Sequence, residues 1–161
     1  MITTADLRKV KDTLIEGMKT NFKNDGNIFP VVIVIGPSGS LTPIPTPYRT
    51  HEEKAFMMNI VRVICKKTDA IAVAVITEAW IKTVNKEDSK KFMEEMKASG
   101  KTVSDYGDKK EVAVIMFETK LTGETITFDM DRDNNKLINK ISATTTGGDF
   151  ANILSPALSE N

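Results

Sequence analysis

Two carboxylates and a lysine in the second half of the chain have the residue types and the spacing of a metal-dependent hydrolytic site. Glu118 follows Asp108 by ten residues, and Lys120 stands two residues beyond Glu118. Two carboxylates can hold one divalent cation, such as Mg²⁺ or Mn²⁺, and a neighbouring lysine can position or activate the attacking water. These residues therefore predict metal-assisted hydrolysis, provided that the fold brings Asp108 and Glu118 to the same ion.

An acid, about ten residues and then Glu-x-Lys resembles the pattern of the PD-(D/E)xK nucleases. The resemblance implies Asp108 and Glu118 as metal ligands, Glu118 and Lys120 as catalytic residues, and DNA as the substrate. Three other carboxylates can supply a further ligand: Glu16, Glu53 and Glu78. The sequence departs from the pattern because no proline precedes the acid and no helix is predicted after the Glu-x-Lys strand. A metal-dependent nuclease is the alternative function.

Two apolar runs, residues 71–78 and 112–119, each contain a glutamate near their end. Both are predicted to be central strands and neighbours, so Glu78 and Glu118 are expected near a common rim of the sheet. Trp80 follows on the same face as Glu78. An indole at a rim packs on the edge of the core or serves as a binding platform or subunit contact. Glu78 and Trp80 are therefore candidate binding residues.

Residues 41–48 carry proline at every second position and end on Tyr48. Prolines two apart remove amides from one side of the chain only, which predicts an outer strand or an extended arm rather than a central strand. Such an arm is suited to docking against a partner. Pro45 and Tyr48 are its candidate binding residues.

Other motifs are better explained by structure than by chemistry. Residues 36–39, Gly-Pro-Ser-Gly, are not followed by the lysine of a phosphate loop or by a helix, and they predict a hairpin turn. Residues 129–133, Asp-x-Asp-x-Asp, resemble the opening of an EF-hand loop. Asn134 stands where that loop needs glycine, and Lys140 stands where it needs glutamate. His51 and Cys65 are the only histidine and cysteine, which excludes an intrachain disulfide and leaves too few ligands for a structural zinc site.

Composition narrows the class of protein. The 161 residues fit one domain, 1–161, and 22 basic residues balance 22 acidic ones. Zero net charge argues against nucleic-acid binding through bulk positive charge and is permissive for self-association. The chain has no basic and apolar leader and no apolar run of roughly 20 residues. A cytoplasmic protein is expected, in the host cytoplasm or the virion if a phage encodes it.

Hydrophobic periodicity and turn residues predict an α+β fold. The predicted helices are residues 4–22, a helix that opens on a capping box at Thr50–Glu53 and closes on Lys66-Lys67, and a short helix between Asp88 and Gly100; the predicted strands are 29–35, 41–48, 70–84, 111–119, 125–131 and 137–143. Consecutive strands late in the chain favour a single mixed or antiparallel sheet. We expect helices mainly on one face, broadly like profilin or roadblock proteins, with 85–110 as a polar insertion and 147–161 as a docked tail.

Three stretches together resemble a family of small uncharacterised proteins from bacteria and their phages. One is a strand ending in Glu-Ala-Trp at residues 77–81; another is the acidic loop of residues 104–111 that leads to Glu118. The third is Phe150 followed by Ile-Leu-Ser-Pro at 153–156. This chain has lysine where the family's loop favours arginine, and a longer insertion before it. The resemblance implies provenance and no established activity.

These observations favour a non-enzymatic interaction protein, a phage or bacterial accessory factor that acts through a protein–protein surface or as an oligomer. No motif is diagnostic of catalysis, the proline-rich arm suits docking, and eight methionines can adapt at contacts. The expected partner is another protein or a second copy of the chain. No cofactor and no membrane are expected, and nucleic acid or Mg²⁺ and Mn²⁺ enter only with the nuclease alternative.

Overall fold

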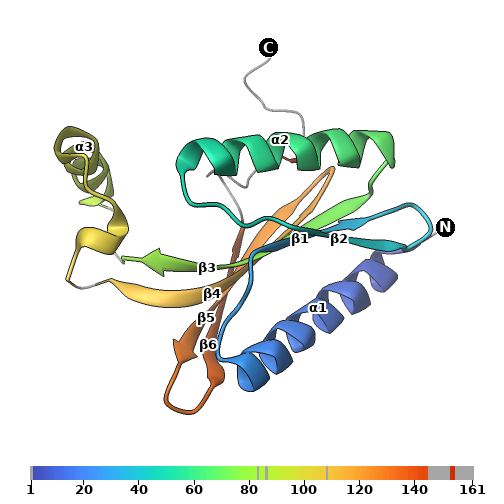
Figure 1. The fold of residues 1–161 in the computed structure, drawn as a ribbon, viewed down its shortest axis with the longest axis horizontal. Helices are drawn as coiled ribbons and strands as arrows, with labels where there is room; N and C mark the ends of the chain where they lie inside the picture. Colours follow the sequence, from blue (N-terminus) through green and yellow to red (C-terminus); the bar gives the residue numbers. More distant parts are fainter. Residues whose placement is uncertain (1, 83, 86, 108, 145–152, 155–161) are drawn as a thin grey trace.

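The computed structural model describes residues 2–82, 84–85, 87–107, 109–144 and 153–154 (Figure 1). The described residues form three α-helices, a short 3₁₀ helix and six strands. In chain order these are α1 (Thr4–Asp25), β1 (Val31–Ile35), β2 (Leu41–Pro45), α2 (His51–Lys67), β3 (Ala72–Ile81), α3 (Ser89–Ser99), η1 (Val103–Asp105), β4 (Lys110–Thr119), β5 (Gly123–Asp131) and β6 (Lys136–Thr144).

All six strands belong to one open antiparallel sheet in the order β2-β1-β3-β4-β5-β6. This confirms the α+β class and the antiparallel sheet, and it confirms that β3 and β4 are neighbours near its middle. Residues 36–39 join β1 to β2 as a hairpin, in which the Gly36 amide donates to the Ser40 carbonyl at 3.0 Å. The two outermost strands are β2, which carries the prolines, and β6.

The inner half of strand β3, residues 72–76, is apolar at every position and is buried on both faces. Ala72 and Ala74 lie in the core on the α1 side of the sheet. Val73 and Val75 lie in the core on the α2 side. The small residues let α1 approach, and the larger valines fill the space under α2.

The two long helices lie on opposite faces of the sheet, which corrects the expectation of helices mainly on one face (Figure 1). Helix α1 buries Ile15, Met18 and Phe22 against one face, whereas α2 buries Met58 and its neighbours against the other. Each sheet face carries enough apolar residues to need its own cover, because residues 72–76 of β3 and 112–117 of β4 are apolar at every position. A crossover between β2 and β3 supplies the second layer.

Helix boundaries follow from capping residues. Thr3 and Asp6 form a reciprocal capping box at the start of α1, and Gly26 ends that helix with a φ of 70°. At α2 the Glu53 amide donates to the Thr50 hydroxyl at 3.1 Å. The Glu53 carboxylate accepts from the Arg49 amide at 2.6 Å, so the predicted box at Thr50 closes one residue earlier than expected.

Helix α3 stands apart from the two layers on an arm formed by the outer halves of β3 and β4 (Figure 1). Strand β1 pairs with β3 only over residues 72–76, so the remainder of β3 pairs with β4 alone. No residue of α3 is buried, and Gly100 ends the helix as predicted. Within the described part of the chain no helix is long and apolar enough to cross a membrane.

Candidate interaction surface

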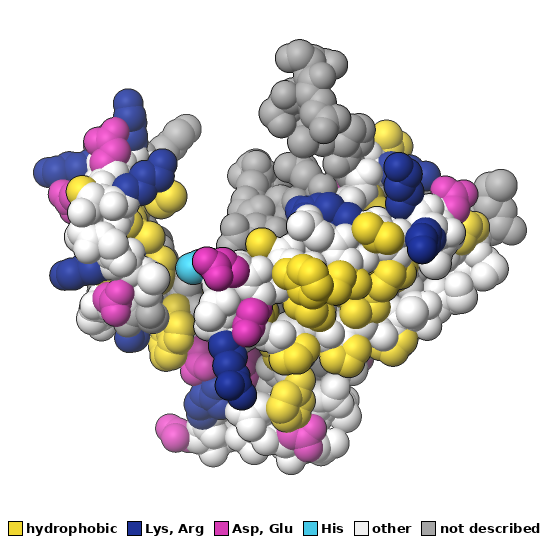
Figure 2. All heavy atoms as spheres, turned by 45° about the horizontal axis from the view of Figure 1, so that its top comes forward, with side chains coloured by type: hydrophobic (Ala, Val, Ile, Leu, Met, Phe, Trp, Pro, Cys, Tyr) yellow, Lys and Arg dark blue, Asp and Glu magenta, His cyan; other side chains and the backbone are white. Residues whose placement is uncertain are grey.

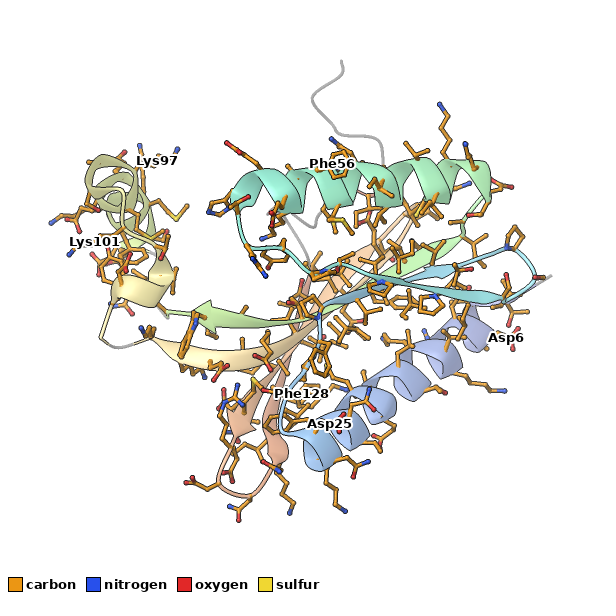
Figure 3. The ribbon with its side chains drawn as sticks, in the orientation of Figure 1. Asp6, Asp25, Phe56, Lys97, Lys101 and Phe128 are labelled. Atoms are coloured by element: carbon orange, nitrogen blue, oxygen red, sulfur yellow. The ribbon has the colours of Figure 1, made fainter. Side chains whose placement is uncertain are left out.

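Helix α2 carries a row of large apolar side chains on the side that faces away from the sheet. Phe56 is 65% exposed, Ile60 36% and Val63 53%. Their spacing of four and then three residues places them on one helical face, one above the other. Phe56 lies on the outer side of α2 in Figure 3. We call Phe56, Ile60 and Val63 the outer row.

The opposite side of the same helix is fully used in packing. Met58, Val61 and Cys65 are buried against β1 and β3, with Met57 and Ile64 partly buried beside them. Helix α2 is thus apolar on both sides, which is unusual for a helix that covers a sheet from the outside. Burial against the sheet therefore does not account for the outer row.

Other exposed large apolar side chains of the described part are scattered. They are Phe29, Leu41, Trp80, Met93, Leu121, Ile138 and Ile141. No other described element exposes more than two of them, and α1 exposes none. Figure 2 shows the hydrophobic side chains gathered over α2, with acidic side chains beside the single histidine at one end of the patch and basic side chains at the other end.

Glu118, the central residue of the predicted metal site, binds the backbone of residues 153 and 154. Its carboxylate accepts the backbone amides of Ile153 at 3.0 Å and of Leu154 at 2.8 Å, and the residue is only 8% exposed. Ile153 packs into the same core cluster as Cys65. Burial, followed by the nearby charge of Glu118, raises the pKa of the Cys65 thiol to about 11, so this thiol is unreactive at neutral pH.

The other members of the predicted metal site do not join Glu118 in a described cluster. The Lys120 ammonium lies 3.5 Å from the Asp69 carboxylate, and both side chains are mostly exposed. Asp108 lies outside the described residues. Among the residues that the structure describes, no group of three histidine, cysteine or acidic side chains is placed to hold a metal ion. Glu118 therefore has a structural role that the sequence did not indicate.

Glu78 belongs to a clamp between the end of α1 and the arm. One of its carboxylate oxygens accepts the Ile28 amide at 2.8 Å, and the other lies 3.5 Å from the Arg132 guanidinium. Arg132 binds Glu111 with two nitrogens, at 3.0 and 2.6 Å, and donates to the Gly26 carbonyl at 2.8 Å. Hydrogen bonding from Arg132 lowers the pKa of Glu111. Neither Glu111 nor Arg132 was a candidate, because nothing local in the sequence pairs them.

The expectation that Glu78 and Glu118 share a rim is wrong. In the antiparallel β3–β4 ladder Glu78 pairs with Ala113, whereas Glu118 pairs with Val73. Five ladder positions, about 17 Å, separate the two glutamates. Their faces also differ, since Glu118 holds residues of the α2-side core and Glu78 holds the α1–β1 connection. Antiparallel neighbours end at opposite sides of the sheet, so two strand-end glutamates cannot meet.

The remaining predicted binding residues lie in different places. Trp80 is 46% exposed on the arm, and the Lys109 ammonium lies 4.9 Å from its ring. Pro45 is an exposed residue at the end of β2. Tyr48 is partly buried against the α2-side core, with the Lys54 ammonium 5.3 Å from its ring. Tyr48 thus packs under the beginning of α2, and Trp80 presents an exposed ring on a separate part of the molecule.

Sequence reasoning assigned the outer row to the helix but not to its surface. The segment was predicted as a helix, with no choice of which of its apolar residues face the sheet. One available signal was that apolar residues lie on two sides of this helix, because positions 57, 58, 61, 64 and 65 already supply a complete inner face.

No protein-family model, no curated protein and no solved structure matches this chain.

Proposed function

We propose that the protein is a non-enzymatic interaction protein whose binding surface is the outer face of α2. One observation carries the proposal: three large apolar side chains stand exposed in a row on a helix whose inner side is fully packed. Contiguous exposed apolar surface in a folded chain marks an interaction site, because water contact with it is unfavourable. A partner surface that covers the row removes this cost.

The buried glutamate of the nuclease alternative has a structural task, which is compatible with a binding role. Glu118 spends both oxygens on backbone amides, and every buried side-chain polar atom among the described residues has a hydrogen-bond partner. The resemblance to small bacterial and phage proteins fits an accessory factor that works in the cytoplasm or in a virion.

A photo-reactive amino acid at position 60 tests the proposal in cells that make the protein. We expect a discrete covalent adduct, identified by mass spectrometry, from position 60 and not from position 20, an exposed site on α1. The adduct should be lost when the photo-reactive chain also carries Val63→Glu, and it should be kept when the chain instead carries Thr20→Glu. If position 60 gives no more adduct than position 20, the outer face of α2 is not a binding surface.

A further inference from the structure

The charges that flank the outer row are ordered along α2. Glu52 and Glu53 lie at its beginning and Lys66 and Lys67 at its end, with the outer row between them. All four charged residues are exposed. Glu53 accepts the Arg49 amide, whereas neither Glu52 nor Lys67 has an ion pair among the described residues. The face is therefore acidic at one end, apolar in the middle and basic at the other end (Figure 2).

When a second copy of α2 runs in the opposite direction, the acidic end of each helix lies beside the basic end of the other, and the apolar middles lie together. A twofold axis placed between positions 59 and 60 brings Glu52 opposite Lys67. The same axis brings Phe56 opposite Val63. Glu52 then faces Lys67, and every member of the outer row faces an apolar or amide side chain. A twofold contact requires one surface to complement itself in this way.

We propose that two copies of the chain associate through their α2 helices, side by side and antiparallel, with the outer rows in contact. The proposal rests on the proposed function and names the partner of that surface as a second copy. Antiparallel pairing also sets the dipole of each helix against that of the other, whereas parallel pairing places like charges together. Zero net charge on each chain leaves no long-range repulsion to oppose the approach.

The size of the surface sets the expected affinity. Helix α2 has 17 residues, so the contact is about 26 Å long and one helix wide. Such a face buries less than the roughly 800 Å² per partner of a standard interface. We expect a dissociation constant on the order of 1–100 µM. The dimer is then a reversible state that depends on protein concentration.

Sedimentation velocity from about 1 µM to about 1 mM tests this pairing. We expect the wild-type chain to dimerise and Val63→Glu to weaken dimerisation by about 100-fold, because it buries a carboxylate opposite Phe56. Glu52→Lys and Lys67→Glu should each weaken it about tenfold by creating two like-charge contacts. The double variant Glu52→Lys/Lys67→Glu should restore it, although it opposes the helix dipole in each chain. Thr20→Glu on α1 is the matched control and should change nothing.

Oxidative cross-linking tests the register. A mixture of Phe56→Cys and Val63→Cys chains should form a disulfide between positions 56 and 63, while either variant alone should not. Native Cys65 is buried and does not compete. The proposal is overturned if the wild type stays monomeric throughout, if Val63→Glu dimerises normally, or if the mixed disulfide fails to form. A monomer that still gives a specific adduct with another protein from position 60 overturns the dimer and leaves the proposed function standing.

Discussion

Helices α1 and α2 cover opposite faces of one sheet, yet their outer sides differ in kind. Helix α1 buries its apolar residues against the sheet and exposes no large apolar side chain. Helix α2 has an equally complete inner face and exposes the outer row as well. The large apolar side chains of α1 are covered by its own chain, whereas the outer row of α2 is left exposed. The difference separates residues that maintain the fold from residues available for association.

The largest expected effect comes from truncating a phenylalanine on each helix. Phe22→Ala should lower the free energy of unfolding by about 3–5 kcal/mol, because Phe22 is fully buried in the core under α1. Phe56→Ala should change it by no more than about 0.5 kcal/mol, since that side chain is exposed. Urea unfolding at protein concentrations well below 1 µM measures both in the monomer. Similar losses at the two positions would contradict the comparison.

A smaller effect is expected at Glu118, which ties residues 153 and 154 to the α2 side of the sheet. Glu118→Ala should cost about 1–3 kcal/mol, because the amides of Ile153 and Leu154 lose their acceptor. Hydrogen exchange at these two amides should accelerate, while exchange in α1 should not. Glu118→Gln keeps one carbonyl acceptor, so its free energy of unfolding should lie between those of the wild type and Glu118→Ala.

The same Glu118 variant also bears on the nuclease hypothesis, which stays a prediction. If the wild-type protein cleaves DNA with Mg²⁺ or Mn²⁺ and a folded Glu118→Ala protein does not, Glu118 acts in chemistry. If no cleavage occurs, or if it is unaffected, the anchoring role described above is sufficient. The nuclease and interaction hypotheses therefore make opposite predictions for one substitution.

The smallest effect is expected at the clamp that fastens the end of α1 to the arm. Arg132→Gln should cost about 0.5–1 kcal/mol at neutral pH, since Arg132 is partly exposed and water screens its ion pairs. Arg132 lowers the pKa of Glu111, so its contribution is present above the usual glutamate pKa of 4.5 and is lost as pH falls through the depressed value. Unfolding measured at pH 7 and pH 3 should therefore show the variant and the wild type converging in acid. A constant difference would exclude the clamp as its source.

Elements governed by local chemistry were predictable from the sequence. Residues 36–39 specify a hairpin, and Gly100 specifies the end of α3. The apolar run of residues 71–78 specifies a central strand. Turns, caps and apolar runs are predictable because they depend on a few neighbouring residues. Strand and helix boundaries follow within a few residues for the same reason.

Features that depend on distant partners were not predictable. The capture of residues 153 and 154 by Glu118 joins positions 35 and 36 residues apart. The contact of Arg132 with the Gly26 carbonyl spans 106 residues. Periodicity alone also does not show which side of α2 faces the sheet, because apolar residues lie on two sides of this helix. The outer row could therefore be recognised only in the folded chain. Glu78 and Glu118 were predicted at a common rim because the sequence does not show the relative direction of their strands. The topology of the sheet makes these strands antiparallel.

The prolines of β2 restrict how the sheet can grow. The Thr46 amide donates to the Pro30 carbonyl at 3.1 Å, so residues 42, 44 and 46 point their backbone groups toward β1 and the odd positions point theirs to the open edge. Pro43 and Pro45 occupy those odd positions and have no amide hydrogen to offer an incoming strand. Fibril-like stacking through this edge is therefore disfavoured even where copies of the chain are crowded. The prolines thereby protect the β2 edge, one of the two open edges of the sheet, from pairing with an incoming strand.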